Sequence, residues 1–161
     1  MPLEERTGRS RRFDSPEQEA YLNLWRTYDR LRAIEDELFG RHDLTAQQYN
    51  ALRLLRAGHP GKTPTLALAA RLVSRAPDIT RLIDRLEERG LVERTRPPGN
   101  RRVVEVGLMP AGLALLADLD VEVRACNARM LGHLAPADLR TLVALLRKAR
   151  RPHEAADGAW L

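Results

Sequence analysis

The spacing of the apolar residues changes at Gly90, and this change constrains the fold more than any other feature of the sequence. Before Gly90, the residues Ile79, Leu82, Ile83 and Leu86 recur at the i, i+3, i+4, i+7 spacing of one helical face. Gly90 stands where a glycine commonly ends a helix in a left-handed conformation. The pattern therefore predicts a short amphipathic helix that begins near Ile79 and ends at Gly90.

After Gly90 the apolar residues alternate with polar ones, which is typical of β-strands. Two such runs, 91–96 and 103–108, are separated by Pro97-Pro98-Gly99-Asn100, a combination that predicts a turn. Arg101 and Arg102 follow the turn directly. A short helix followed by a hairpin with arginines at its tip is the outline of a winged helix-turn-helix.

The segment ITRLIDRLEERGLVERTRPPGNRRVVEVGLMPAG resembles the recognition helix, wing and following helix start of the MarR family of bacterial transcription regulators. The family pattern is Asp-Arg-Arg at the wing, then alternating apolar residues, then a Thr-x-x-Gly helix start. This chain has Asn100-Arg101-Arg102 and then Met109-Pro110-Ala111-Gly112. The resemblance is clear over about 45–116 and continues more loosely, by helix order and length, toward both ends. It implies that the first and the last two helices entwine in a dimer about a two-fold axis.

Capping signals predict the remaining helices. Ser15-Pro16 predicts a start near residue 16 and Gly40 an end, while Thr45 and Gln48 form a capping box for a helix that runs to about 57. A third helix is expected to open at Thr63-Pro64, with Leu66, Ala69, Ala70 and Leu72 as its apolar stripe, and two more are expected over about 110–131 and from 134 onward.

We therefore expect a mainly α fold with a small β-hairpin wing: a winged helix-turn-helix with N- and C-terminal dimerisation helices, in the order α-α-α-α-β-β-α-α. The surplus of apolar residues between Tyr21 and Leu38 favours burial against a second subunit. The expected divisions are a disordered basic tail (1–15), an N-terminal dimerisation helix (16–44), a winged helix-turn-helix DNA-binding region (45–109), C-terminal dimerisation helices (110–151) and a tail (152–161). The alternative for Arg6, Arg9, Arg11 and Arg12 in the first tail is a basic arm that touches the DNA backbone.

Charge and cysteine content narrow the classes of partner. The formal net charge is +5 with a pI near 10.1, which favours a polyanionic partner. The single cysteine, Cys126, excludes an internal disulfide framework and is typical of a reducing cytoplasm. No apolar run approaches the roughly 20 residues of a membrane span, so no membrane partner is expected.

The arginines of the helix and the wing are the candidate DNA ligands. The polar face of the helix would enter the major groove, the wing tip an A·T-rich minor groove, and the strand arginines would contact phosphate. The alternative for the helix is a solvated face with intrahelical ion pairs. The predicted DNA-binding residues are Arg75, Asp78, Thr80, Arg81, Arg85, Arg94, Arg96, Arg101 and Arg102.

Two departures from the family pattern bear on DNA recognition. By resemblance, the wing aspartate orients the arginine two residues later, here Arg102; Asn100 replaces that aspartate and can donate or accept a hydrogen bond without forming an ion pair. Pro77 and Asp78 stand where the family usually has small hydroxyl residues. Asp78 is repelled by phosphate but is able to accept a hydrogen bond from a cytosine N4.

Aromatic residues of the first two helices, Tyr21, Trp25, Tyr28 and Tyr49, either pack in the core or line a cleft that, by resemblance, receives small aromatic or phenolic acids. Cys126 follows the spacing of a buried seam, which favours a small core residue over a redox sensor. The histidines His42, His59, His133 and His153 are scattered, so neither a metal nor a cofactor is expected.

No catalytic motif is present, so we expect no enzyme. The sequence predicts a cytoplasmic, sequence-specific regulator that binds double-stranded DNA as a homodimer at a pseudo-palindromic operator, and most simply a ligand-responsive repressor. The alternatives are a winged-helix module for protein–protein contact without DNA binding, or redox sensing through Cys126. The arginine pair at the wing tip speaks against the protein-contact alternative, because protein interfaces favour aromatic or apolar residues.

Overall fold

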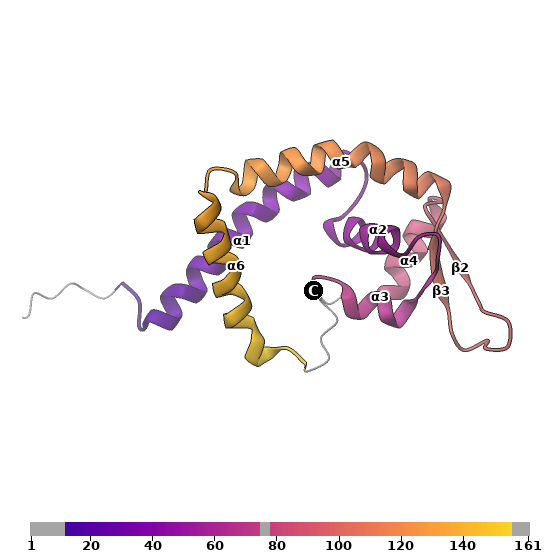
Figure 1. Cartoon of the computed structure of the whole chain (residues 1–161), viewed down its shortest axis with the longest axis horizontal. Coiled ribbons are helices and arrows are strands. Elements are labelled where there is room, and N and C mark those ends of the chain that lie inside the picture. The colour runs from indigo at the N-terminus through magenta and orange to yellow at the C-terminus, as the bar shows by residue number, and fades with distance from the viewer. Residues whose placement is uncertain (1–11, 75–77, 156–161) are drawn as a thin grey trace, which may run out of the picture.

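The computed structural model describes residues 12–74 and 78–155, and it is mainly helical with a small antiparallel sheet, as predicted. A winged helix-turn-helix forms one end, and two long helices extend from it side by side (Figure 1). The elements are α1 (Pro16–Gly40), α2 (Ala46–Gly58), β1 (Thr63–Pro64), α3 (Thr65–Arg71), α4 (Ile79–Glu88), β2 (Val92–Thr95), β3 (Glu105–Leu108), α5 (Pro110–Leu131), α6 (Pro136–Arg150) and the 3-10 turn η1 (Arg151–His153).

The helix starts follow the capping residues. The Ser15 hydroxyl accepts a hydrogen bond from the backbone N–H of Gln18, and Pro16 is the first residue of α1. At α2 the capping box is complete: the Thr45 hydroxyl accepts from the Gln48 N–H, and the Gln48 side chain accepts from the Thr45 N–H. Both predicted starts are confirmed.

The sheet has a third strand that the sequence did not suggest. Thr63–Pro64 was expected to open a helix, but it forms β1, which pairs antiparallel with β3 so that Thr63 lies opposite Val106. The sheet order is β1-β3-β2, and α3 begins at Thr65 instead. The Thr65 N–H and hydroxyl both donate to the Val104 carbonyl. This third strand ties the start of the helix-turn-helix to the wing.

The buried face of α3 also differs from the expected stripe. Leu68 and Leu72 are buried, whereas Leu66 is 81% exposed. Because the helix begins two residues later than expected, Leu68 rather than Leu66 turns toward α2. The prediction was right for Leu72 and wrong for Leu66.

The core lies where α2, α4 and the sheet meet the first half of α5. Gly112 shows how closely these elements approach: a Cβ atom on it would lie 2.3 Å from the Leu91 carbonyl oxygen. A side chain at this position would therefore push α5 away from the base of the wing. The largest fully buried side chains are Phe39, Leu52, Leu55, Leu68, Ile83, Leu86, Leu116, Leu119, Val92 and Val106.

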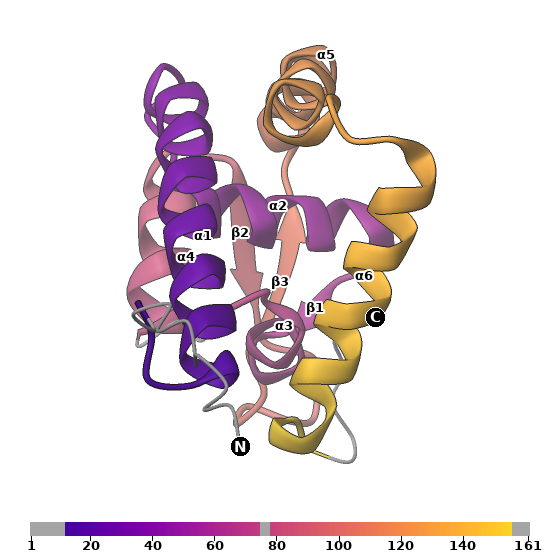
Figure 2. The ribbon, with the colours of Figure 1, turned by 90° about the vertical axis from the view of Figure 1, so that its left-hand side faces the viewer.

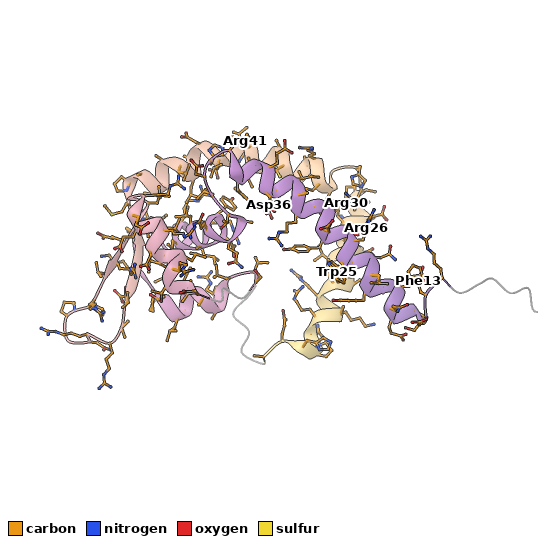
Figure 3. The ribbon with its side chains drawn as sticks, turned by 180° about the vertical axis from the view of Figure 1, so that it is seen from behind. Phe13, Trp25, Arg26, Arg30, Asp36 and Arg41 are labelled. Carbon is orange, nitrogen blue, oxygen red and sulfur yellow. The ribbon has the colours of Figure 1, made fainter. Side chains whose placement is uncertain are left out.

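The long helices leave apolar surface uncovered. α6 has no buried residue, although Leu142 and Val143 lie on it. Trp25 on α1 is 61% exposed and packs only against Tyr21, with 6.1 Å between ring centroids. Figure 3 shows Trp25, Arg26 and Arg30 along the same exposed part of α1. None of the helices in the described part of the chain is long and apolar enough to cross a membrane.

Candidate nucleic-acid interface

Helix α4 begins at Asp78, whose carboxylate is its N-cap. Asp78 Oδ1 accepts a hydrogen bond of 2.9 Å from the Arg81 N–H, and Oδ2 lies 3.9 Å from Arg81 Nε. One oxygen is thus engaged at the helix start, and the other faces a neighbouring cation. This local role accounts for an acidic residue on a helix that is otherwise suited to DNA, and no sequence pattern used above had pointed to it.

The amphipathic pattern of α4 places its polar face outward. Leu82, Ile83 and Leu86 are buried, whereas Thr80, Arg81 and Arg85 are exposed. Two contacts from α2 hold the turn that leads into α4: Gln47 Nε2 donates to Ser74 Oγ at 2.8 Å, and the Val73 N–H donates to Asn50 Oδ1 at 3.0 Å. Arg75 and Pro77, which were predicted to lie in this turn and helix start, fall outside the described residues.

Arg94 on β2 is occupied inside the chain. Its guanidinium donates to Asp84 Oδ1 and, at 3.1 Å, to Glu87 Oε2, and its own backbone N–H donates to Glu87 Oε1 at 3.0 Å. The side chain is only 25% exposed. The structure therefore favours a bracing role between wing and helix over the phosphate contact expected from the sequence. Asp84 and Glu87 were missed as its partners, because their approach to β2 depends on the tight turn at Gly90.

The wing tip is held by backbone contacts that leave two guanidinium groups free. Asn100 Oδ1 accepts from the Arg102 N–H at 3.2 Å, so it fixes the Arg102 backbone rather than its guanidinium. Arg96 donates to the Arg101 carbonyl oxygen and so braces the tip. Gly99 has φ +86°, the left-handed conformation the turn needs. Within residues 12–74 and 78–155, no carboxylate pairs with Arg101 or Arg102, and both are exposed.

Ion pairs fasten α5 to the DNA-binding end. Asp120 receives both guanidinium nitrogens of Arg56, at 3.1 and 3.0 Å, and this hydrogen bonding lowers the pKa of Asp120. Glu122 accepts from His42 Nε2 at 3.0 Å and from Arg41 Nη2 at 3.2 Å, and these bonds lower the pKa of Glu122.

Arg89 continues this connection to the recognition helix. It follows the end of α4 and donates to the backbone carbonyls of Asp43 and His42, at 2.7 and 3.2 Å. The loop between α1 and α2 is thus held from both sides, by Arg89 through its backbone and by Glu122 through the His42 side chain. The sequence gave no signal for either contact.

A cleft of about 950 Å³ lies between α1, α2 and α5. Tyr28 and Tyr49 line it, as expected from the sequence, but Tyr21 and Trp25 are not among its lining residues. Tyr49 stacks on Phe39 with 4.5 Å between ring centroids, and burial raises the pKa of the Tyr49 phenol. The described lining residues are Tyr28, Arg32, Glu35, Asp36, Leu38, Phe39, Leu44, Thr45, Ala46, Gln47, Tyr49, Asn50, Arg53, Val73, Ser74, Val123, Cys126 and Asn127.

The cations of the cleft differ in their partners. Arg32 pairs with Asp36 at 3.4 Å, whereas Arg53 is exposed and no described carboxylate pairs with it. Burial, together with the nearby Asp36 carboxylate, raises the pKa of Glu35. Arg53 is thus the cation available to an anionic group inside the cleft.

Cys126 lies in the cleft wall, and its burial raises the pKa of its thiol. A thiol held in its protonated form reacts slowly with oxidants, which disfavours the redox-sensing alternative. No group of three or more His, Cys, Asp or Glu side chains with metal-binding geometry occurs in the part of the chain that the structure describes.

Comparison with known proteins identifies the family. The MarR family model matches residues 44–104. The HTH-type transcriptional repressor NicR of Pseudomonas putida is 32% identical over 136 residues, which are 84% of this chain and 84% of NicR.

Two solved structures are similar over most of their length. A MarR transcription factor from Planctomyces limnophilus is 62% identical with a TM-score of 0.68, covering 84% of this chain and 98% of its own. BpsR of Bordetella bronchiseptica, whose structure concerns the regulation of DNA binding by 6-hydroxynicotinic acid, is 30% identical with a TM-score of 0.74, covering 85% and 96%. With this fold, this wing and these relatives, the chain belongs to the MarR family, and it is a transcriptional regulator rather than an enzyme.

Proposed function

We propose that this regulator binds a pseudo-palindromic duplex as a homodimer and acts as a ligand-responsive repressor. The observation that carries the DNA-binding mode is the set of exposed guanidinium groups on α4 and the wing tip, those of Arg81, Arg85, Arg101 and Arg102. The buried face of α4 and the Asn50 and Gln47 contacts fix the helix that presents the first two. Recognition by a helix in the major groove and an arginine in the minor groove requires such a fixed frame.

The test of DNA binding is the salt dependence of affinity, because each neutralised phosphate lowers the slope of log affinity against log salt by roughly 0.9. We expect a steep slope for the native chain. Replacing Arg85 by Gln should reduce the slope without unfolding the protein, because no described carboxylate pairs with Arg85. Failure to bind any duplex would support the protein-interaction alternative instead.

The dimer is proposed from the uncovered apolar surface of α1 and α6. Tyr21, Trp25 and Tyr28 are all more than half exposed, and α6 has no buried residue in its own chain. A helix with an apolar face needs a partner for that face, and α6 finds none here. Sedimentation at micromolar concentration should report about twice 18.2 kDa. A folded monomer at this concentration, or no loss of association in Trp25→Glu, would overturn this part of the proposal.

The dimer fixes the spacing expected of the operator. Two recognition helices related by a two-fold axis read half-sites about 10 base pairs apart, centre to centre, or a multiple of that. Footprinting on the DNA that flanks the gene should show two protected half-sites in inverted repeat. Protection of one asymmetric half-site would contradict the two-fold arrangement.

The proposed effector is a small aromatic or phenolic acid bound in the cleft between α1, α2 and α5. The unpaired Arg53 supplies a cation for the carboxylate, and the Tyr49 and Tyr28 rings supply surfaces for an aromatic ring. NicR is named a repressor, and 6-hydroxynicotinic acid regulates DNA binding by BpsR. A ligand that binds one spacing of the recognition helices better than another shifts the population toward that spacing.

Calorimetry with 6-hydroxynicotinic acid and benzoate, against neutral benzamide, tests the cleft. We expect the acids to bind, benzamide not to bind, and Arg53→Gln to weaken the acids at least tenfold. Arg30→Gln, which alters a cation of α1 that is not among the cleft-lining residues, is the matched control. Equal binding of benzamide and benzoate would refute the role of Arg53.

A further inference from the structure

The far end of α6 carries a stripe of cations. Arg140, Arg147 and Arg151 follow one another at spacings of seven and four residues, which places them on one side of the helix, and Lys148 lies next to them. All four side chains are exposed. The apolar residues Leu139, Leu142 and Leu146 form the adjacent stripe.

The stripe is not explained by contacts within the chain. Arg150 pairs with Glu154, but in the described part of the chain no carboxylate lies within ion-pair distance of Arg140, Arg147, Lys148 or Arg151. Cations in the last turn of a helix are favoured by the helix dipole, which accounts for Arg147 and Lys148 only. Arg140 belongs to the second turn, where the dipole has no such effect. A continuous stripe therefore indicates an anionic partner outside the chain.

The placement of α6 identifies which anionic partner is within reach. From the end of α5, α6 runs down to the level of α3 and of the wing tip (Figure 1). The view turned about the same vertical axis shows the end of α6, α3 and the hairpin tip at the same lower edge (Figure 2). The end of α6 thus faces the same side as the wing, and it belongs to the half of the molecule from which the partner subunit is proposed to rise.

We propose that the cationic end of α6 binds the sugar-phosphate backbone of DNA between the two half-sites. The inference rests on the proposed homodimer, in which the two copies of α6 flank the two-fold axis and the winged helices lie outside them. Phosphates carry no sequence information, so these contacts add affinity and salt dependence to the complex without adding base preference. They also favour DNA whose central segment continues uninterrupted beneath the dimer.

The competing partner is the first turn of α1 in the second subunit, which carries Glu17 and Glu19. Ion pairs between that turn and the end of α6 would stabilise the dimer and leave DNA affinity alone. The two partners give opposite results when the cations are removed, because one changes the DNA complex and the other changes the association of subunits.

The experiment compares Arg147→Gln/Arg151→Gln with a matched pair, Arg26→Gln/Arg124→Gln, whose exposed cations lie on α1 and α5. Anisotropy titration of a labelled 30-base-pair duplex of random sequence, over a series of salt concentrations, gives the slope for each protein. With up to two phosphates lost per subunit, the α6 pair should lower the slope by about 2 to 4, against little change in the matched pair. Sedimentation and thermal melting check that both variants remain folded dimers.

An α6 variant with the native slope would overturn the inference while leaving the proposed function intact. A variant that dissociates into monomers would overturn it in favour of the acidic turn of α1. If the native chain itself fails to dimerise or to bind any duplex, then the proposed function has failed first. A second duplex, with a four-nucleotide single-stranded gap at its centre, should bind the native dimer more weakly and the α6 variant equally. Equal loss in both proteins would again contradict a central contact.

Discussion

Replacing Arg94 by Gln should destabilise the fold and leave the salt dependence of DNA binding unchanged. The substitution removes the two charge-assisted contacts from the guanidinium to Asp84 and Glu87. Hydrogen bonds to charged groups contribute about 1.5–3 kcal/mol each when buried, and exposed ion pairs about 0–1 kcal/mol. The two carboxylates are 46% and 41% exposed, so solvent screening brings the expected loss to about 1–2 kcal/mol for both contacts together.

Two assays separate the bracing role of Arg94 from a phosphate contact. Urea unfolding followed by circular dichroism measures the loss of stability, and anisotropy titrations at several salt concentrations measure the slope. A phosphate contact would lower that slope by roughly 0.9 per subunit. Affinity itself should fall, because the two carboxylates freed on and beside α4 then face the DNA.

Arg102→Gln is the matched control, since its guanidinium is exposed and its backbone alone is held by Asn100. We expect its stability to stay within about 0.5 kcal/mol of the native value while its salt slope falls. The reverse outcome, in which Arg94→Gln keeps full stability and loses slope, would refute the reasoning.

Three further changes test the frame of the site. Gly112→Ala should cost about 3 kcal/mol in urea unfolding, because the new Cβ would lie 2.3 Å from the Leu91 carbonyl oxygen; a loss below about 1 kcal/mol would show that α5 moves away easily. Asp78→Ala should cost about 1 kcal/mol through loss of the N-cap and Asp78→Asn much less, and equal losses would argue against capping. Because hydrogen bonding from Arg56 lowers the pKa of Asp120, the stability it contributes is complete above the ordinary carboxyl pKa of about 4 and is lost as the pH falls through the lower folded value. Melting temperatures between pH 6 and about 2 should therefore fall less steeply in Arg56→Gln, and identical pH profiles would contradict the assignment.

The elements that sequence predicted correctly are those whose signal is local. Ser15, Thr45 and Gly90 mark helix ends through contacts with residues a few positions away, and all three have the expected roles. The alternation after Gly90 likewise placed β2 and β3 within two residues of their observed ends. The exposed arginines of the wing tip follow directly from the position of the turn.

The features that sequence missed depend on the approach of distant segments. Thr63–Pro64 has a helix-start composition, yet pairing with Val106 on β3 makes it a strand. Arg94 carries the same charge as Arg101, and only the proximity of Asp84 and Glu87 gives it a different role. The separation of Tyr28 from Tyr21 and Trp25 at the cleft likewise depends on how α1 crosses α2 and α5.

The length of α5 has a consequence for how closely the operator must match the dimer. Its 22 residues span about 33 Å at 1.5 Å per residue, and no proline or glycine interrupts it after Gly112. Its first turn is pressed against the base of the wing, while its last turn carries α6. A tilt of about 5° at the α6 end would then move each wing by about 3 Å, or about 6 Å for the pair. Since successive base pairs are about 3.4 Å apart, that tilt shifts the two reading heads by nearly two base-pair steps along the duplex.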